Sequence, residues 1–479
     1  MKKNFFKIGI LYSIGQLLVK GLAFLLIPLY SKYLGADVYG QLALVDIVYN
    51  FLGMFIICSI YSGYIRFYSE DINNNGFATV FNFSLISILI QGIIIIGFGK
   101  YFSKFLLEME NSYLILILIF LRGSLEQIIS LLESIYSMEY RVKKIICVRF
   151  LITLITLMTI LYLVIIKKET IIGIYKGYIL GNFLVLFYLI YDNRKKIKFV
   201  FERIFLKKCL KFSIGLLLGS VSYLILAMID RFFLKEYQSF TQVGVYSMGY
   251  KFASLIEIFF IASFKKVFTP FKFQEYKNKN FEYKLNKFFD YYNIIGIVIF
   301  LLISINIKAV LYLFTSEEFL EAYLITPVIT FSYLLYGQIE FYSLGVNLKN
   351  KTYITSLILL FGGIINILFN ILWIKKYGMY GAAFSTIISY IIMLIVYVII
   401  SNRLYYLKLN FKKMFKIFTS GMFIYLIYLF LSIQNLNIFL EITIGNILIL
   451  VYLYIIYNYF IDKKEVNKFI LERINNKIT

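Results

Sequence analysis

Charged side chains inside long apolar runs are the residues of this sequence most suited to binding or chemistry. Lys20 and Arg122 each interrupt such a run near its middle, and the carboxylates Asp46 and Glu340 lie in two others. A charge at the centre of a membrane-spanning helix costs about 2.5–3.5 kcal/mol even on lenient scales, so it requires a partner, a hydrated cavity or a function. These residues are therefore the first candidates for a site.

The depth and spacing of these charges suggest partners for some of them. Lys20 is too deep to reach water easily, so it either lines a substrate cavity or pairs with a carboxylate such as Asp46. Arg122 and Glu126 are four residues apart, which places them on one helix face and predicts a structural ion pair. We expect that pair to leave little net charge at its position.

Five further charges lie nearer the ends of the apolar runs. Lys176 and Lys251 either line the cavity or extend their side chains to the interface. Arg66 closes an apolar run, where it either binds cargo or anchors the helix at the inner surface. Asp230 and Arg231 are adjacent at the end of a run, so a helix-end charge pair and a functional site both fit them.

The composition indicates an integral membrane protein without an enzymatic centre. Of the 479 residues, 61% are hydrophobic and 16% charged, whereas a soluble domain carries about 25% charged residues. The net charge of +23 comes from short basic clusters between apolar runs, which argues against nucleic acid as a partner. Histidine is absent, and Cys58, Cys147 and Cys209 lack CxxC spacing. We therefore predict no catalytic residue, no metal site and no enzyme activity.

The apolar runs predict an all-α polytopic membrane protein, because about 20 apolar residues are needed for each helix that crosses a bilayer. The first run lacks a cleavage site and is interpreted as a retained span. Lysine and arginine are concentrated in alternate loops, which predicts that both termini are cytoplasmic. We predict about fourteen spans, near residues 9-30, 41-65, 78-99, 112-134, 146-166, 171-191, 212-232, 244-264, 290-313, 323-345, 354-374, 379-400, 412-431 and 437-460.

Matching glycine positions predict an internal repeat, as in many transporters. The pairs are Ser13-Ile14-Gly15 with Ser213-Ile214-Gly215, Gly40 with Gly244, and Gly173 with Gly381. They predict two six-helix halves, formed by residues 1-200 and 201-405. Residues 406-479 would then hold two appended helices and a basic cytoplasmic tail.

Several segments resemble the bacterial polysaccharide flippases of the multidrug, oligosaccharidyl-lipid and polysaccharide exporter superfamily. The resemblance extends to about residue 400. It is carried by Ser13-Ile14-Gly15, Lys20-Gly21, the stretch from Pro28-Leu29-Tyr30 to Val38-Tyr39-Gly40, Ile229-Asp230-Arg231-Phe232, Gly244-Val245-Tyr246 and Tyr377-Gly378-Met379-Tyr380-Gly381.

The resemblance implies two six-helix bundles around a central cavity, which rock between inward- and outward-open states in the cytoplasmic membrane of a bacterium. The implied cargo is an undecaprenyl-pyrophosphate-linked oligosaccharide used for surface polysaccharides such as O-antigen or capsule, and other polysaccharide assembly proteins are implied partners. Lys20, Lys251, Lys176 and Arg66 could bind the pyrophosphate. No cofactor is expected, but a proton or sodium gradient could drive the cycle through Asp46, Asp230 or Glu340.

Two other functions compete with a flippase. A drug exporter of the same superfamily would pair an anionic cavity with cationic drugs, whereas the deep unpaired charge here is Lys20. A membrane polymerase or ligase of polysaccharides would carry catalytic residues in a large outer loop, and the predicted outer loops are short. The sequence contains no Walker motif, which excludes ATP as the direct energy source.

Overall fold

The computed structural model describes residues 24–71, 75–349, 353–432 and 437–460, together with positions 15, 19, 21, 22 and 351. All regular secondary structure within these residues is helical, which confirms the all-α class. The chain divides into two compact units, which are treated separately here. Unit 1 comprises Met1–Val245, Phe314–Phe319 and Asn370–Gly378, and unit 2 comprises Tyr246–Leu313, Leu320–Phe369 and Met379–Thr479.

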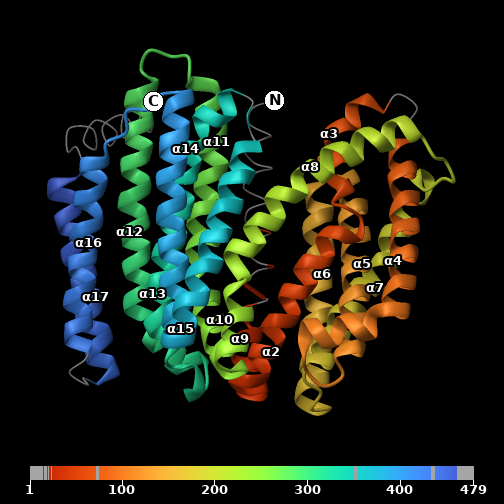
Figure 1. Ribbon diagram of the computed structural model, residues 1–479, viewed down its shortest axis with the longest axis horizontal. Coiled ribbons are helices and arrows are strands. Elements are labelled where there is room, and N and C mark those ends of the chain that lie inside the picture. The colour runs from red at the N-terminus through yellow and green to blue at the C-terminus, as the bar shows by residue number, and fades with distance from the viewer. Residues whose placement is uncertain are drawn as a thin grey trace, which may run out of the picture. The chain divides into compact units, whose positions relative to one another are not determined.

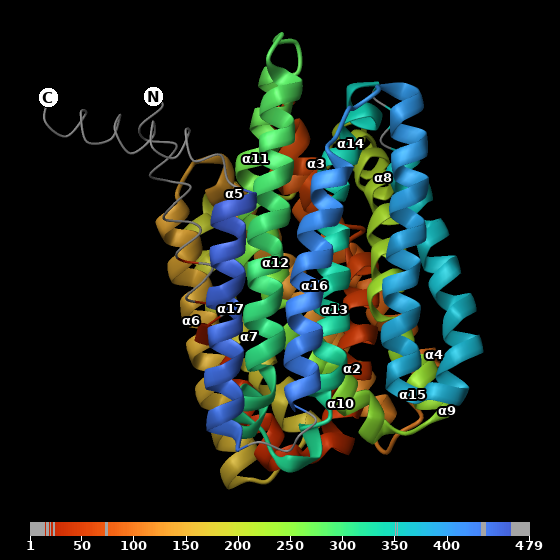
Figure 2. The same cartoon turned by 90° about the vertical axis from the view of Figure 1, so that its left-hand side faces the viewer.

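Unit 1 is built from long helices that pack along one another, and α4, α5, α6 and α7 lie side by side in it (Figures 1 and 2). Its helices are α2 (Leu26–Ile56), α3 (Ile60–Phe67), α4 (Gly76–Leu107), α5 (Ser112–Met138), α6 (Val142–Leu161), α7 (Ile171–Asn193), α8 (Arg203–Met228) and α9 (Asp230–Tyr237), with the short helices η1 (Tyr68–Glu70), η2 (Tyr162–Ile166) and η3 (Arg194–Lys196). Helix α10 (Phe240–Ala253) begins in this unit.

Unit 2 contains the remaining helices, and its last two, α16 and α17, form an antiparallel pair (Figure 1). The elements are η4 (Glu257–Ile261), α11 (Ala262–Glu275), α12 (Phe281–Phe314), α13 (Ala322–Gly337), α14 (Ile339–Leu348), α15 (Tyr353–Leu404), α16 (Phe411–Ser432) and α17 (Ile438–Tyr459). Three pieces of this part of the chain belong to unit 1: the last residue of α12, the short helix η5 (Glu317–Phe319) and residues Asn370–Gly378 of α15.

Eleven helices in the described part of the chain are long and apolar enough to cross a membrane, so the protein is a multi-pass membrane protein. One of them, α15, has 52 residues, which is enough for two crossings of a bilayer at about 20 residues each. Gly378 interrupts α15 with a φ of +54°, between the predicted spans 354-374 and 379-400. The total of fourteen spans stays a prediction, because half of 9-30 lies outside the described residues.

Two predicted boundaries are wrong. The span at 41-65 is broken between α2 and α3, where Cys58 and Ser59 both have a φ of +50°. The segment between the predicted spans 244-264 and 290-313 is mostly helical, since α11 runs to Glu275 and α12 begins at Phe281. Hydropathy windows detect neither a turn within an apolar run nor a helix that continues beyond the apolar residues.

The glycines Gly40 and Gly244, matched in sequence as repeat positions, face each other in unit 1. A Cβ on Gly40 would overlap the carbonyl oxygen of Phe240, and one on Gly244 would overlap that of Ala36. Both obstacles are backbone atoms, so α2 and α10 approach as closely as helices can at this crossing. The predicted lobes 1-200, 201-405 and 406-479 stay predictions. Residues from both sides of the boundary at 200 are in contact in unit 1, where Gly63 of α3 donates its N–H to Ser213 Oγ of α8 over 3.1 Å.

Candidate functional site

Three predicted site residues, Asp46, Arg122 and Glu126, come together in unit 1, on α2 and α5. Lys20, the deepest predicted cation, lies outside the described residues, so its assignment stays a prediction. The other predicted residues are treated below. The unit 1 group is the richest cluster of charges in the described part of the membrane-spanning helices.

Arg122 is held between aromatic rings and a carboxylate. Its guanidinium carbon lies 3.9 Å from the ring centre of Tyr49 and 3.7 Å from that of Tyr178. Its Nη1 pairs with Asp46 Oδ1 at 3.3 Å, and Tyr175 donates its hydroxyl to the same oxygen over 2.9 Å. Aromatic faces stabilise a guanidinium electrostatically. Only 14% of the Arg122 side chain is exposed, so α2, α5 and α7 together fix this charge.

The predicted pair of Arg122 with Glu126 is replaced by pairs between helices. Glu126 accepts a hydrogen bond from Nη1 of Arg149 on α6, and Arg149 also donates Nε and Nη2 to Glu133 Oε2 over 3.0 and 2.6 Å. The guanidinium of Arg149 can bridge two carboxylates because its donors form a planar fork. Helical i,i+4 spacing brings two residues near each other, but a better-oriented tertiary partner takes precedence.

Arg149 and Glu133 were not predicted as site residues. Arg149 lies only a few residues from the end of its apolar run, so its side chain was expected to extend to the membrane interface. A signal was available on α5, where Glu126 and Glu133 are seven residues apart and therefore share a face. Two carboxylates on one buried face require a cation from a neighbouring helix.

The charges of this network do not balance. Arg122 and Arg149 supply two positive charges, against three carboxylates on Asp46, Glu126 and Glu133. Glu133 is 7% exposed, and its Oε1 has no hydrogen-bond partner. The Asp46 side chain is 47% exposed, so the burial cost falls mainly on Glu133, and a buried carboxylate that is not fully compensated is costly unless a proton or a cation neutralises it. The network is therefore suited to binding one positive charge.

A polar cavity of about 200 Å³ lies against the network. Two of its wall atoms, Thr156 Oγ1 and Asn182 Oδ1, are buried and have no hydrogen-bond partner. Unpaired polar atoms beside a polar cavity are suited to hold water or a small ligand. The wall is formed by Leu26, Tyr49, Arg122, Glu126, Ile152, Thr153, Thr156, Leu157, Tyr178 and Asn182.

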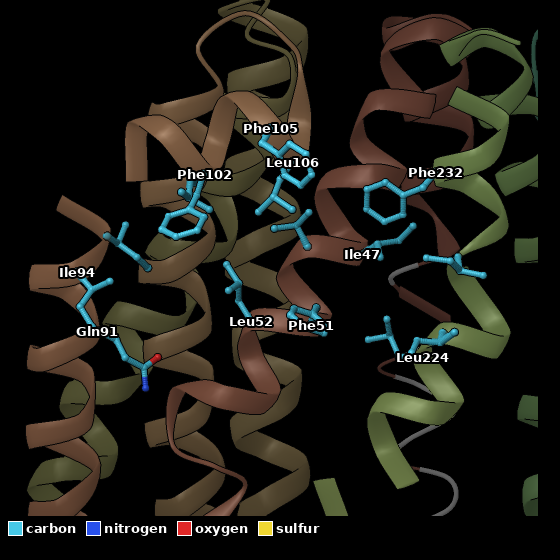
Figure 3. A pocket seen from close by; sticks show the side chains of 15 residues that line it. Ile47, Phe51, Leu52, Gln91, Ile94, Phe102, Phe105, Leu106, Leu224 and Phe232 are labelled. Carbon is cyan, nitrogen blue, oxygen red and sulfur yellow. The ribbon is translucent and has the colours of Figure 1, made fainter. Parts of the chain in front are cut away.

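A larger apolar groove of about 650 Å³ lies elsewhere in unit 1 (Figure 3). Phe102, Phe105 and Leu106 of α4 line it, opposite Leu224 of α8 and Phe232 of α9. The one polar side chain in its wall, Gln91, donates its amide to the carbonyl oxygens of Phe55 and Ile56 over 3.2 and 2.9 Å. The groove can therefore accept an apolar chain without leaving a polar group unpaired.

The other cations predicted to bind cargo have varied surroundings. Lys176 pairs with Glu169 at 2.8 Å and is 48% exposed, which is the geometry of a surface ion pair. Arg66 is exposed beside the ring of Phe67, with its guanidinium carbon 5.4 Å from the ring centre. Lys251 is exposed on α10. The role of these three cations as cargo ligands stays a prediction.

The predicted coupling carboxylates Asp230 and Glu340 each have a cationic partner. Asp230 pairs with Arg231 at 3.1 Å, and both side chains are buried. Glu340, in unit 2, pairs with Lys265 at 2.6 Å and Lys272 at 3.1 Å. Lys272 is 2% exposed and was missed, because its position was assigned to a loop; it lies on α11.

Comparison with solved structures establishes the fold. The chain resembles the lipid II flippase MurJ in an inward-closed conformation, with a TM-score of 0.72 and 21% identity over 94% of this chain and 99% of that one. It also resembles a multidrug resistance MATE family transporter of the MOP superfamily, inward-facing, with a TM-score of 0.67 and 15% identity over 82% of this chain and 97% of that one.

Comparison with protein sequences assigns the family. An uncharacterized membrane protein of Methanocaldococcus jannaschii, MJ1068, is 24% identical over 264 residues, which are 54% of this chain; the match spans about half of the relative's length. The model of the family described as polysaccharide biosynthesis protein matches residues 31–284, more than half of the chain. The chain therefore belongs to the polysaccharide biosynthesis protein family.

Proposed function

We propose that the protein is a flippase that moves undecaprenyl-pyrophosphate-linked oligosaccharide repeat units across the cytoplasmic membrane for surface polysaccharide synthesis. The observation that carries the proposal is the pairing, on helix α2, of an apolar groove with an arginine-lined polar cavity. Phe51 lines the groove and Tyr49 lines the cavity, so both sites share this helix. A lipid-linked pyrophosphate has the same two parts, an apolar chain and an anionic group.

The roles of the two sites follow from their chemistry. The groove would hold part of the polyprenyl chain, because it is lined almost entirely by apolar side chains. The cavity would present Arg122, whose planar fork suits phosphate oxygens. No catalytic step is required, since the cargo is moved unchanged. The family of the chain and its likeness to a lipid II flippase support this assignment.

Deletion of the gene in its own host tests the proposal. A flippase defect should leave lipid-linked repeat units on the inner leaflet, where labelling of intact cells with an impermeant reagent does not reach them. Single unpolymerised units that are already labelled from outside would instead support the polymerase alternative.

Drug export is a second candidate, favoured by the excess carboxylate in the unit 1 network and by the likeness to a MATE transporter. A cavity with a net negative charge would attract cationic drugs. Expression of the protein in a drug-sensitive strain separates the two functions. The flippase proposal predicts unchanged sensitivity to cationic drugs, and a raised resistance would favour export.

Replacement of Arg122 by lysine should slow transport about tenfold, because lysine keeps the charge but loses the planar fork and the stacking between Tyr49 and Tyr178. Initial rates of lipid translocation in reconstituted vesicles measure this effect. The matched control is Arg141→Lys, since Arg141 forms an exposed ion pair with Glu139. Equal rates for the two variants would remove Arg122 from the site.

We further propose that the unit 1 network couples transport to a proton or sodium gradient. The excess negative charge would be neutralised by the coupling cation, with Glu126 facing the cavity. Glu126→Gln removes that charge, so transport by this variant should no longer respond to an imposed gradient, whereas Glu139→Gln should respond as the wild type does. Imposing pH and sodium gradients separately on vesicles identifies the ion. An unchanged response in Glu126→Gln would exclude this network from coupling.

A further inference from the structure

The connection between α7 and α8 carries an exposed basic surface. We define the basic surface as Arg194, Lys195, Lys198, Arg203, Lys207 and Lys211, which have no carboxylate within ion-pair distance among the described residues. Two other lysines of the segment do have such partners, since Lys196 pairs with Glu139 and Lys208 with Glu70. The uncompensated positive charge is therefore concentrated on one short stretch of chain.

Two large apolar side chains project from the same segment. Phe199 is fully exposed and Ile204 is 79% exposed. The backbone around Phe199 is fixed by hydrogen bonds on both sides of this residue. Asn82 of α4 donates its Nδ2 to the carbonyl oxygens of Lys198 and Val200 over 2.9 and 3.0 Å. The fold thus keeps a phenyl ring outside the protein core.

The first turns of α8 continue this arrangement. Phe205, Leu206 and Cys209 are buried against unit 1, and the main-chain N–H of Glu202 is bound by Thr79 Oγ1 over 3.0 Å. The opposite face of the helix carries Ile204 among the exposed cations of the basic surface. The first turns of α8 therefore have one face buried in the protein and an opposite face that presents both basic and apolar side chains, as in helices that lie at a membrane interface.

We infer that the basic surface binds anionic phospholipid headgroups of the leaflet at its end of the membrane, with Phe199 and Ile204 inserted into the interfacial region. The segment is juxtamembrane, because it comprises the end of the candidate span Ile171–Lys196, the start of the candidate span Arg203–Tyr237 and the residues between them. Clusters of four to eight Lys and Arg beside a membrane span bind anionic lipids, and apolar side chains among them enter the headgroup boundary. A soluble anionic partner would use the cations but would leave the phenyl ring in water.

Tryptophan fluorescence of the full-length protein tests this inference. Trp373 is the only tryptophan in the sequence, so Phe199→Trp in a Trp373→Phe background reports on position 199 alone. The protein is placed in vesicles of phosphatidylcholine, with or without phosphatidylglycerol, that contain lipids brominated near the headgroup. We expect blue-shifted emission and about twofold stronger quenching when phosphatidylglycerol is present.

Matched charge removals complete the test. Lys195→Gln/Lys198→Gln should abolish the added quenching by phosphatidylglycerol, whereas Lys167→Gln/Lys168→Gln, at an exposed turn after η2, should leave it unchanged. Emission typical of water at position 199 that lipid bromines do not quench would overturn the inference, as would quenching that is independent of phosphatidylglycerol. Neither outcome bears on the proposed transport activity.

Discussion

Replacement of Arg149 by methionine should lower the free energy of unfolding by about 3 kcal/mol, because it leaves two partly buried carboxylates without their cation. Arg149 bridges Glu126 and Glu133, whose side chains are only 25% and 10% exposed. Methionine retains much of the side-chain volume, so the loss reports on charge more than on a cavity. Thermal unfolding in detergent, followed by circular dichroism, measures the difference.

The control for this variant is Arg141→Met, which breaks an exposed ion pair with Glu139 and should cost less than about 1 kcal/mol. A rescue variant separates charge from packing. Arg149→Met combined with Glu126→Gln and Glu133→Gln should regain most of the lost stability, because no buried carboxylate is then left unpaired. Equal melting temperatures for Arg149→Met and Arg141→Met would show that the network does not stabilise unit 1.

Replacement of Gly40 by valine should prevent stable folding of unit 1, or lower its stability by about 3 kcal/mol or more. The new side chain would overlap the carbonyl oxygen of Phe240 and crowd the main-chain nitrogen of Gly244, which lies 2.9 Å from the Cβ position. Backbone atoms cannot rotate away as a side chain can, so α2 and α10 would have to separate. The yield of monodisperse protein and its melting temperature measure the effect.

The matched control is Gly97→Val on α4, where no atom lies within 4 Å of the Cβ position. This variant should fold, and Gly97→Ala should be stabilised by about 0.5–1 kcal/mol through helix propensity. Gly40→Ala should already be less stable than the wild type, although alanine favours helix more than glycine does. A stabilised Gly40→Ala variant would contradict the close approach of α2 and α10.

Much of the helical framework was predictable because the bilayer imposes one length and one backbone solution on every apolar run. Matching Gly40 with Gly244 also anticipated a structural role, although their mutual contact was not expected. The helix boundaries at Cys58 and Glu275 were missed, because hydropathy does not encode a left-handed turn or a helix that continues into water.

The charge pairs were harder to predict, since they depend on tertiary geometry. Asp46 and Arg122 were identified separately, but their mutual pair joins residues 76 positions apart. Neither Arg149 nor Lys272 was singled out, because Arg149 lies near the end of a predicted span and Lys272 lies between two predicted spans. In both cases the deciding fact is which neighbouring helix presents a carboxylate, and a single sequence does not contain that information.

The most direct test of the proposed function is translocation of the cargo by purified protein. Vesicles containing the protein would carry a fluorescent undecaprenyl-pyrophosphate-linked oligosaccharide, and an impermeant reductant would quench the molecules in the outer leaflet. The flippase proposal predicts that the wild type exchanges the protected and accessible pools far faster than protein-free vesicles, and that Arg122→Lys does so about tenfold more slowly than the wild type. Equal rates in wild-type and protein-free vesicles, with and without an imposed ion gradient, would contradict it.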